Sequence, residues 1–131
     1  MKFEFIYVHF SMLLNSFLLY GANGYTGELI ARYAKQYNLE PILAGRRKKV
    51  IEPLAKQLNY TFRVFDLNDK ASLIEALKDV KLVIHAAGPF QFTAQQMIEA
   101  CLETGTHYLD INGDIAVFEL IKRYDAAAKK A

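Results

Sequence analysis

Cysteine is nearly absent from this chain, since Cys101 is the only one among its 131 residues. A single cysteine excludes an internal disulfide and fits a reducing compartment. Charge of one sign is also scarce, because the formal net charge is only +2 and the basic residues are scattered along the sequence. This balance argues against a nucleic-acid partner. No His, Cys, Asp and Glu residues stand at metal-ligand spacing, so the sequence predicts no metal site.

A long uninterrupted hydrophobic run is missing as well, although a membrane span needs about twenty predominantly apolar residues. The segment 2–20 is rich in apolar side chains, but Glu4, His9 and several other polar residues interrupt it, and no small-residue cleavage site follows. We therefore expect no membrane contact and a cytoplasmic location. Residues 1–15 are interpreted as a leader or as an extra strand, which could pair edge to edge in a homodimer.

From residue 16 onwards, apolar β-forming segments alternate five times with segments of helical periodicity. The connections are short, which predicts a doubly wound parallel sheet of the Rossmann type in a three-layer α-β-α domain over residues 16–131. The expected strands are 16–20, 40–44, 60–65, 81–86 and 106–111, and the expected helices are 25–37, 49–58, 69–78, 91–103 and 114–130.

A glycine loop follows the first expected strand at the point where a helix begins. Gly21 would let the chain turn sharply, Gly24 would let the backbone approach a pyrophosphate, and Gly27 would let the helix pack closely on the sheet. Free backbone N–H groups at the helix N-terminus would then bind the pyrophosphate. The predicted contacts are Gly21, Asn23, Gly24, Tyr25, Thr26 and Gly27.

The second expected strand ends in arginines rather than in an acid. A dinucleotide with a free ribose 2′-hydroxyl usually meets Asp or Glu there, roughly twenty residues after the glycines. Arg46 and Arg47 stand in that place, and planar guanidinium groups suit a 2′-phosphate, so the prediction is NADP rather than NAD. The alternative is that both arginines are solvated residues at a helix start. Asp66, which closes the third strand, would accept from the adenine amino group or would serve as an ordinary loop residue.

The ends of the last two strands offer further candidates. Ala87, Gly88 and Pro89 are small residues that would let a cofactor ribose and diphosphate approach, although a tight βα turn requires the same residues. His85 is interpreted as a satisfied core histidine rather than as a base. No tyrosine is followed by lysine four residues later, so the Tyr/Lys pair of short-chain dehydrogenases is missing and no catalytic residue is assigned.

These motifs together resemble the N-terminal NADP-binding domain of saccharopine-dehydrogenase-like oxidoreductases. The resemblance rests on the glycine loop, the Ala44-Gly45-Arg46 element, the Ala87-Gly88-Pro89-Phe90 turn and the segment from Ala100 to Asp110. The branch includes trans-acting enoyl reductases. The resemblance implies hydride transfer to or from NADP(H), with the nicotinamide near the Gly88-Pro89 turn.

Whole members carry a C-terminal substrate domain for which this chain has no room, so the resemblance also implies a fragment that binds cofactor without turnover. The rival interpretation is a non-catalytic module that senses NADP. The chain departs from the family at His85 and at Asn112-Gly113-Asp114, where Thr-Gly-Glu is common.

Overall fold

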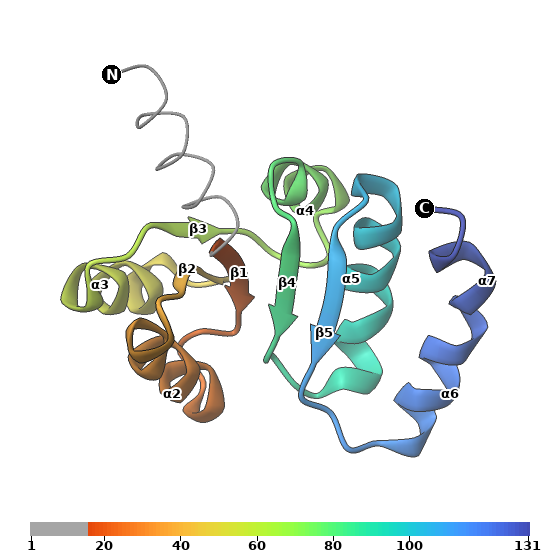
Figure 1. Cartoon of the computed structure of the whole chain (residues 1–131), viewed down its shortest axis with the longest axis horizontal. Coiled ribbons are helices and arrows are strands. Elements are labelled where there is room, and N and C mark those ends of the chain that lie inside the picture. Colours follow the sequence, from red (N-terminus) through yellow and green to blue (C-terminus); the bar gives the residue numbers. More distant parts are fainter. Residues whose placement is uncertain (1–15) are drawn as a thin grey trace.

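The computed structural model describes residues 16–131 (Figure 1). The predicted leader or extra strand over residues 1–15 lies outside this range, and so does the edge-to-edge pairing that it would allow. Within the described range, strands and helices alternate along the chain as the sequence predicts.

Five parallel strands form one sheet in the order β3-β2-β1-β4-β5. This arrangement confirms the predicted doubly wound α/β fold. The central strand β1 pairs with β2 on one side, with Leu18 opposite Ile42, and with β4 on the other, with Leu18 opposite Val83. The strands are β1 Ser16–Tyr20, β2 Glu40–Gly45, β3 Phe62–Val64, β4 Leu82–His85 and β5 His107–Asp110.

The helices differ from the sequence prediction mainly at their ends. The segment expected as one helix over 25–37 is an α-helix only to Tyr33, because its last turn tightens into a 3-10 helix that ends at a left-handed Asn38. The helix expected over 114–130 is likewise divided at Tyr124. The helices are α2 Tyr25–Tyr33, η1 Ala34–Tyr37, α3 Lys48–Leu58, α4 Lys70–Leu77, α5 Phe90–Thr104, α6 Ile115–Arg123 and α7 Asp125–Ala128.

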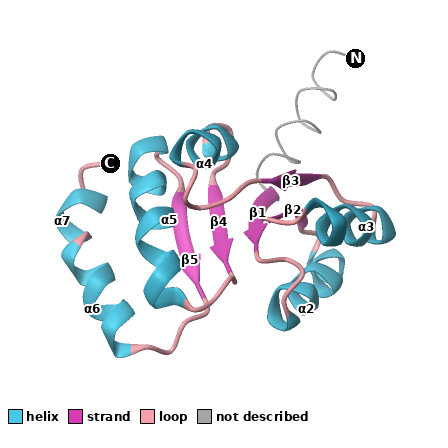
Figure 2. Ribbon diagram, turned by 180° about the vertical axis from the view of Figure 1, so that it is seen from behind, coloured by secondary structure: helices cyan, strands magenta, loops and turns pink. Residues whose placement is uncertain are grey.

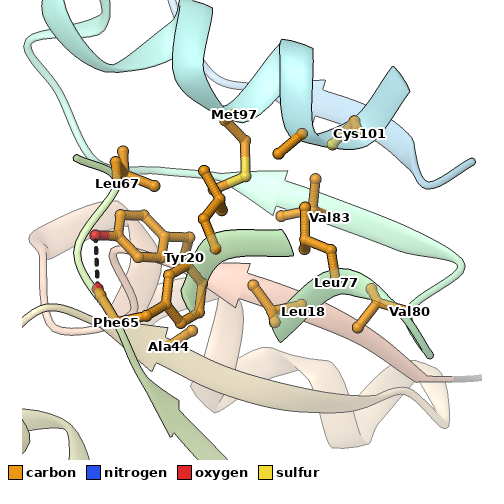
Figure 3. Close-up of a cluster of buried hydrophobic side chains, with 12 residues drawn as sticks. Leu18, Tyr20, Ala44, Phe65, Leu67, Leu77, Val80, Val83, Met97 and Cys101 are labelled. Carbon is orange, nitrogen blue, oxygen red and sulfur yellow. Dashed lines mark hydrogen bonds between the residues drawn. The ribbon is translucent and has the colours of Figure 1, made fainter. Parts of the chain in front are cut away.

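Alternate residues of β1 supply the cores on the two faces of the sheet, because successive strand side chains point to opposite sides. Leu18 and Tyr20 belong to a cluster that includes residues of α4 and α5 (Figure 3). Phe17 and Leu19 belong to a second cluster that includes residues of α2 and α3. The sheet is therefore covered by two helices on each face, which gives the three layers seen in Figure 2.

The last helices lie outside this sandwich. Val117 of α6 packs on Ala94 and Ile98 of α5, so that α5 separates α6 from the sheet (Figure 1). Two helices begin at an aspartate that caps them: Asp69 accepts from the backbone N–H of Ser72 at the start of α4, and Asp114 accepts from that of Ala116 at the start of α6. No helix within residues 16–131 has the length and apolar character needed to span a membrane.

The strand order places a crevice at one end of the sheet. The chain moves outward from β1 through β2 to β3 and then crosses to β4 on the other side of β1. Ligands of open α/β sheets bind at such a switch point, beyond the carboxyl ends of the strands. The glycine loop, the arginines and the Ala87–Pro89 turn all follow strand ends of this kind.

Candidate functional site

A cleft of about 520 Å³ opens at the carboxyl ends of the strands. Most of the predicted site residues line it, although they come from four separate strand ends. These nine are Gly21, Asn23, Gly24, Arg46, Arg47, Asp66, Ala87, Gly88 and Pro89. The other three, Tyr25, Thr26 and Gly27, are not among the lining residues, and the side chain of Tyr25 is 86% exposed.

Gly21 turns the chain where β1 meets β4. Its φ of +84° lies in the left-handed region, which favours glycine. A Cβ atom there would lie 2.8 Å from both the carbonyl carbon of Ala86 and the nitrogen of Ala87. The N–H of Gly21 donates to the Ala44 carbonyl at 2.9 Å. The loop is thus held directly against the neighbouring strand ends.

Gly27 serves the close packing that the sequence predicts for it. A Cβ atom at Gly27 would lie 2.2 Å from the carbonyl oxygen of Gly21, so only glycine allows α2 to approach the loop this closely. The N-cap residue Gly24 has no side chain to cap the helix. The first-turn N–H groups of an α-helix have no partner within the helix. The first-turn N–H groups of α2 therefore lie next to the glycine loop, at the positive end of the helix dipole.

The arginines form the opposite rim of the cleft. Arg46 and Arg47 follow β2, and both side chains are exposed. No ion pair involves either guanidinium within residues 16–131. The preceding residue, Gly45, is buried, and a Cβ atom there would lie 2.9 Å from Ile51 and 3.2 Å from Asn23 Oδ1. The rim therefore combines a closely packed backbone at Gly45 with two positive charges that have no acidic partner in the described part of the chain.

Asp66 begins the loop between β3 and α4 and is held by its own neighbourhood. Its Oδ1 accepts from the backbone N–H of Asn68 at 2.8 Å and from Asn68 Nδ2 at 3.0 Å. Tyr20 lies at the floor of the cleft and donates its hydroxyl to the Phe65 carbonyl at 3.2 Å (Figure 3). Burial, reinforced by the charge of Asp66, raises the pKa of Tyr20 to about 12. Tyr20 is therefore a neutral hydrogen-bonding group at neutral pH.

The sequence analysis did not assign several residues that line the cleft. Phe92 is the most exposed of them that is apolar, since 68% of its surface is accessible. Phe92 and Gln96 lie one helical turn apart on α5, so they share a face of that helix. Their signal in the sequence is the helix that starts directly after the Gly88-Pro89 turn. The unassigned residues are Tyr20, Gly45, Leu67, Asn68, Ala86, Phe92, Thr93 and Gln96.

The Ala87–Pro89 turn is tied to α5 through Thr93. The Thr93 hydroxyl donates to the Ala87 carbonyl at 2.8 Å and lies 3.3 Å from the Pro89 carbonyl. It also lies 3.0 Å from Nε2 of His85, whose side chain is fully buried. The prediction of a core histidine is correct for the position. The expectation that it is satisfied holds only for one nitrogen, because Nδ1 has no partner within residues 16–131.

The end of β5 holds a separate hydrogen-bond network. Tyr108 and Asp110 lie two residues apart and share a face of the strand, and the Tyr108 hydroxyl donates to Asp110 at 2.7 Å. Burial raises the pKa of Tyr108 well above its usual range, and that of the buried Cys101 to about 12. Within the described range, no three His, Cys, Asp or Glu side chains are placed to bind a metal ion together.

Known proteins are similar to this chain in sequence. The chain is 29% identical to the saccharopine dehydrogenase-like oxidoreductase of Mus musculus in an alignment of 134 positions, which covers 86% of this chain and 31% of the relative. The lipid droplet localized protein of Caenorhabditis elegans is 28% identical over 127 residues, covering 86% of this chain and 30% of that protein. The chain thus spans about a third of the length of the curated relatives it matches.

Solved structures support the fold. The apo saccharopine dehydrogenase (L-Glu forming) of Saccharomyces cerevisiae superposes with a TM-score of 0.66 at 21% identity, covering 86% of this chain and 25% of that one. The family model described as "Saccharopine dehydrogenase NADP binding domain" matches residues 17–131. These residues include the glycine loop, the arginine rim and the turn after β4. The chain therefore belongs to the saccharopine dehydrogenase NADP binding domain family, as its motifs predict.

Proposed function

We propose that residues 16–131 form the NADP(H)-binding domain of a saccharopine-dehydrogenase-like oxidoreductase. The observation that carries this proposal is a single cleft that joins a helix N-terminus without a side-chain cap to two arginines without acidic partners among residues 16–131. The first suits a pyrophosphate, and the second suits the 2′-phosphate that distinguishes NADP from NAD.

The residues present fit such a dinucleotide. Gly21 and Gly24 leave the backbone of the loop open to the pyrophosphate, together with Asn23 and the first-turn amides of Tyr25, Thr26 and Gly27. Arg46, with Arg47 beside it, would pair with the 2′-phosphate. Asp66 would accept from the adenine amino group through its carboxylate. Ala87, Gly88 and Pro89 would lie along the nicotinamide side, where their small size admits the ribose.

In this proposal the chain binds and orients the cofactor and does not complete an active site. The bound nicotinamide would supply hydride transfer, and a substrate would have to be held by residues beyond this unit. No side chain of residues 16–131 is assigned a catalytic role. A cytoplasmic location stays a prediction, and the relative named for lipid droplets is a reason to test it by microscopy.

Calorimetric titration of the chain with NADPH and NADH tests the proposal. We expect tight binding of NADPH and much weaker binding of NADH, because only NADPH carries the 2′-phosphate. The fragment 2′-phospho-ADP-ribose should bind as well, since it keeps the phosphate groups and the adenine. An Arg46→Ala variant should lose the preference for NADPH. Arg123→Ala is its control for the loss of one positive charge, because Arg123 lies at the end of α6 and does not line the cleft. Absence of binding for all three ligands would contradict the proposed function.

A further inference from the structure

His85 stands out because it places a polar ring at the carboxyl end of the apolar strand β4, which lies between β1 and β5 in the sheet. Its side chain is fully buried, and rings of Tyr20, Phe90 and Tyr108 surround it with centroids at 5.8, 5.2 and 6.2 Å. An aliphatic residue would fill this space without a buried nitrogen that lacks a partner. Burial of an unpaired polar atom costs stability. A histidine at this position is therefore best explained by the hydrogen bond that its ring makes.

The hydrogen bonds define which nitrogen of His85 carries the proton. The Thr93 hydroxyl has one hydrogen, and the Ala87 carbonyl accepts it at 2.8 Å. In that arrangement its oxygen is the acceptor at the 3.0 Å contact with His85 and Nε2 is the protonated nitrogen, whereas donation from the hydroxyl to Nε2 would require the opposite tautomer. Nδ1 is left as a bare acceptor, consistent with its lack of a partner among the described residues.

The surroundings keep this imidazole neutral. Burial lowers the pKa of His85 to about 4, and the charge of Asp110 opposes this only in part. The Asp110 carboxylate is already occupied, because it accepts from the Tyr108 hydroxyl and from the backbone and side-chain nitrogens of Asn112. The hydroxyls of Tyr20 and Tyr108 likewise have other acceptors. None of the described residues around the ring supplies a second hydrogen bond to it.

We propose that His85 is a positioning residue of the cofactor cleft: its Nε2–H holds the Thr93 hydroxyl, which in turn fixes the Ala87 carbonyl and hence the Ala87–Pro89 turn. This inference rests on the proposed function, because its consequence is that the cleft wall already has the geometry that the dinucleotide requires. Preset geometry favours binding because less ordering is left to the moment of association. Neither His85 nor this chain of hydrogen bonds is expected from the family motif, since the sequence departs from it at His85.

Paired variants separate the hydrogen bond from the volume of the ring. His85→Met removes the donor at similar volume, whereas His85→Gln keeps an N–H donor at a comparable distance from the backbone. Thr93→Val removes the hydroxyl with little change in shape. We expect the NADPH dissociation constant to rise about fivefold to tenfold in His85→Met and in Thr93→Val. We expect the double variant to be no worse than either single variant and His85→Gln to bind nearly as the unmodified chain does.

Equal NADPH affinity in the unmodified chain, His85→Met and Thr93→Val would overturn the proposal, and so would additive losses in the double variant. The ¹⁵N spectrum of the imidazole provides a second, independent readout. It should show a protonated Nε2 and an unprotonated Nδ1 at neutral pH, and the opposite tautomer would overturn the assignment.

A failure of the proposed function can be told apart from a failure of this inference. If the unmodified chain binds no NADPH, the function is wrong, and hydrogen exchange at the Ala86 and Phe92 amides, which donate to the carbonyls of Tyr20 and Pro89, then decides the role of His85. Exchange about tenfold faster in His85→Met and Thr93→Val, but not in His85→Gln, would support a clamp on the turn. Equal exchange rates in all variants would overturn it. Thr93→Val keeps the test available should His85→Met fail to fold.

Discussion

The two sides of the cleft are built in opposite ways. The glycine loop on one side is closed by backbone contacts, so that a Cβ atom at Gly21 or Gly27 would lie within 3.0 Å of neighbouring main-chain atoms. The arginine rim, made of Arg46 and Arg47, has exposed side chains without an acidic partner among the described residues. The loop glycines are therefore required by the packing of the fold, whereas the guanidinium groups of the rim have no ion pair in the described part of the chain that a substitution would break. Substitutions should lower stability on the first side and affinity on the second.

Gly27→Ala should show the largest effect on the loop side. The new methyl group would lie 2.2 Å from the Gly21 carbonyl oxygen, and backbone atoms cannot give way as a flexible side chain can. We expect a loss of about 3 to 5 kcal/mol in the free energy of unfolding, measured by chemical denaturation.

Gly24→Ala is the matched control for that variant. The added Cβ would meet only the Gly21 carbonyl oxygen, at 3.3 Å, and the φ of −77° suits any residue. Its cost in unfolding free energy should be about 1 kcal/mol or less. Equal losses for the two variants would show that packing of α2 against the loop does not distinguish Gly27.

His85 extends the comparison, because it lies beneath the cleft wall and its protonation should change the stability of the fold. Its pKa is about 4 in the folded chain, below the ordinary value of 6.5, so the unfolded chain binds the proton more readily. The stability that depends on the neutral ring is complete above pH 6.5 and is lost as the pH falls towards 4. The whole effect amounts to about 3 kcal/mol at most.

Denaturation of the unmodified chain and of His85→Gln at several pH values between 4 and 7 measures this effect. The unfolding free energy of the unmodified chain should fall as the pH is lowered from 7 to 4. That of His85→Gln should fall much less, because glutamine does not titrate. Parallel curves for the two proteins would mean that His85 does not carry the acid sensitivity.

The sequence predicted the alternation of strands and helices and the backbone roles of Gly21 and Gly27, for a physical reason. Both follow from local signals, namely apolar periodicity and glycine spacing at a strand end. The same signals do not report where a helix stops. The 3-10 turn after Tyr33 arises where the chain must bend at Asn38 to enter β2, which no periodicity encodes.

The residues that the sequence analysis missed reach the cleft only through tertiary structure. Phe92, Thr93 and Gln96 depend on how α5 lies relative to the strand ends, and neither hydropathy nor spacing determines this orientation. The partner of His85 was hidden for the same reason, since Thr93 lies eight residues away on another element. Tyr25 shows the converse case, because its place in the glycine motif says nothing of its side chain, which points to solvent.

Arg46→Ala should lower affinity without lowering stability. A guanidinium paired with a phosphate is a charge-assisted interaction, so the NADPH dissociation constant should rise about tenfold to a hundredfold. The NADH constant should change little, and the melting temperature should stay within experimental error because the Arg46 side chain has no ion pair within residues 16–131. Arg47→Ala, tested in parallel, shows whether the second arginine shares the phosphate. Equal losses for NADPH and NADH would contradict a 2′-phosphate contact.

Phe92→Ala should have the smallest effect and tests whether the open side of the cleft extends to α5. The ring is 68% exposed and faces the cleft, so its removal should change the unfolding free energy by about 0.5 kcal/mol or less. Stacking of an aromatic side chain on a planar ring of the ligand contributes about 1 kcal/mol or more, which predicts a loss of about fivefold in NADPH affinity. Phe118→Ala is the control, because Phe118 is 49% exposed on α6 and does not line the cleft. If both variants bind NADPH equally well, the ligand does not reach α5, and the exposure of Phe92 belongs instead with the other apolar side chains on the surface.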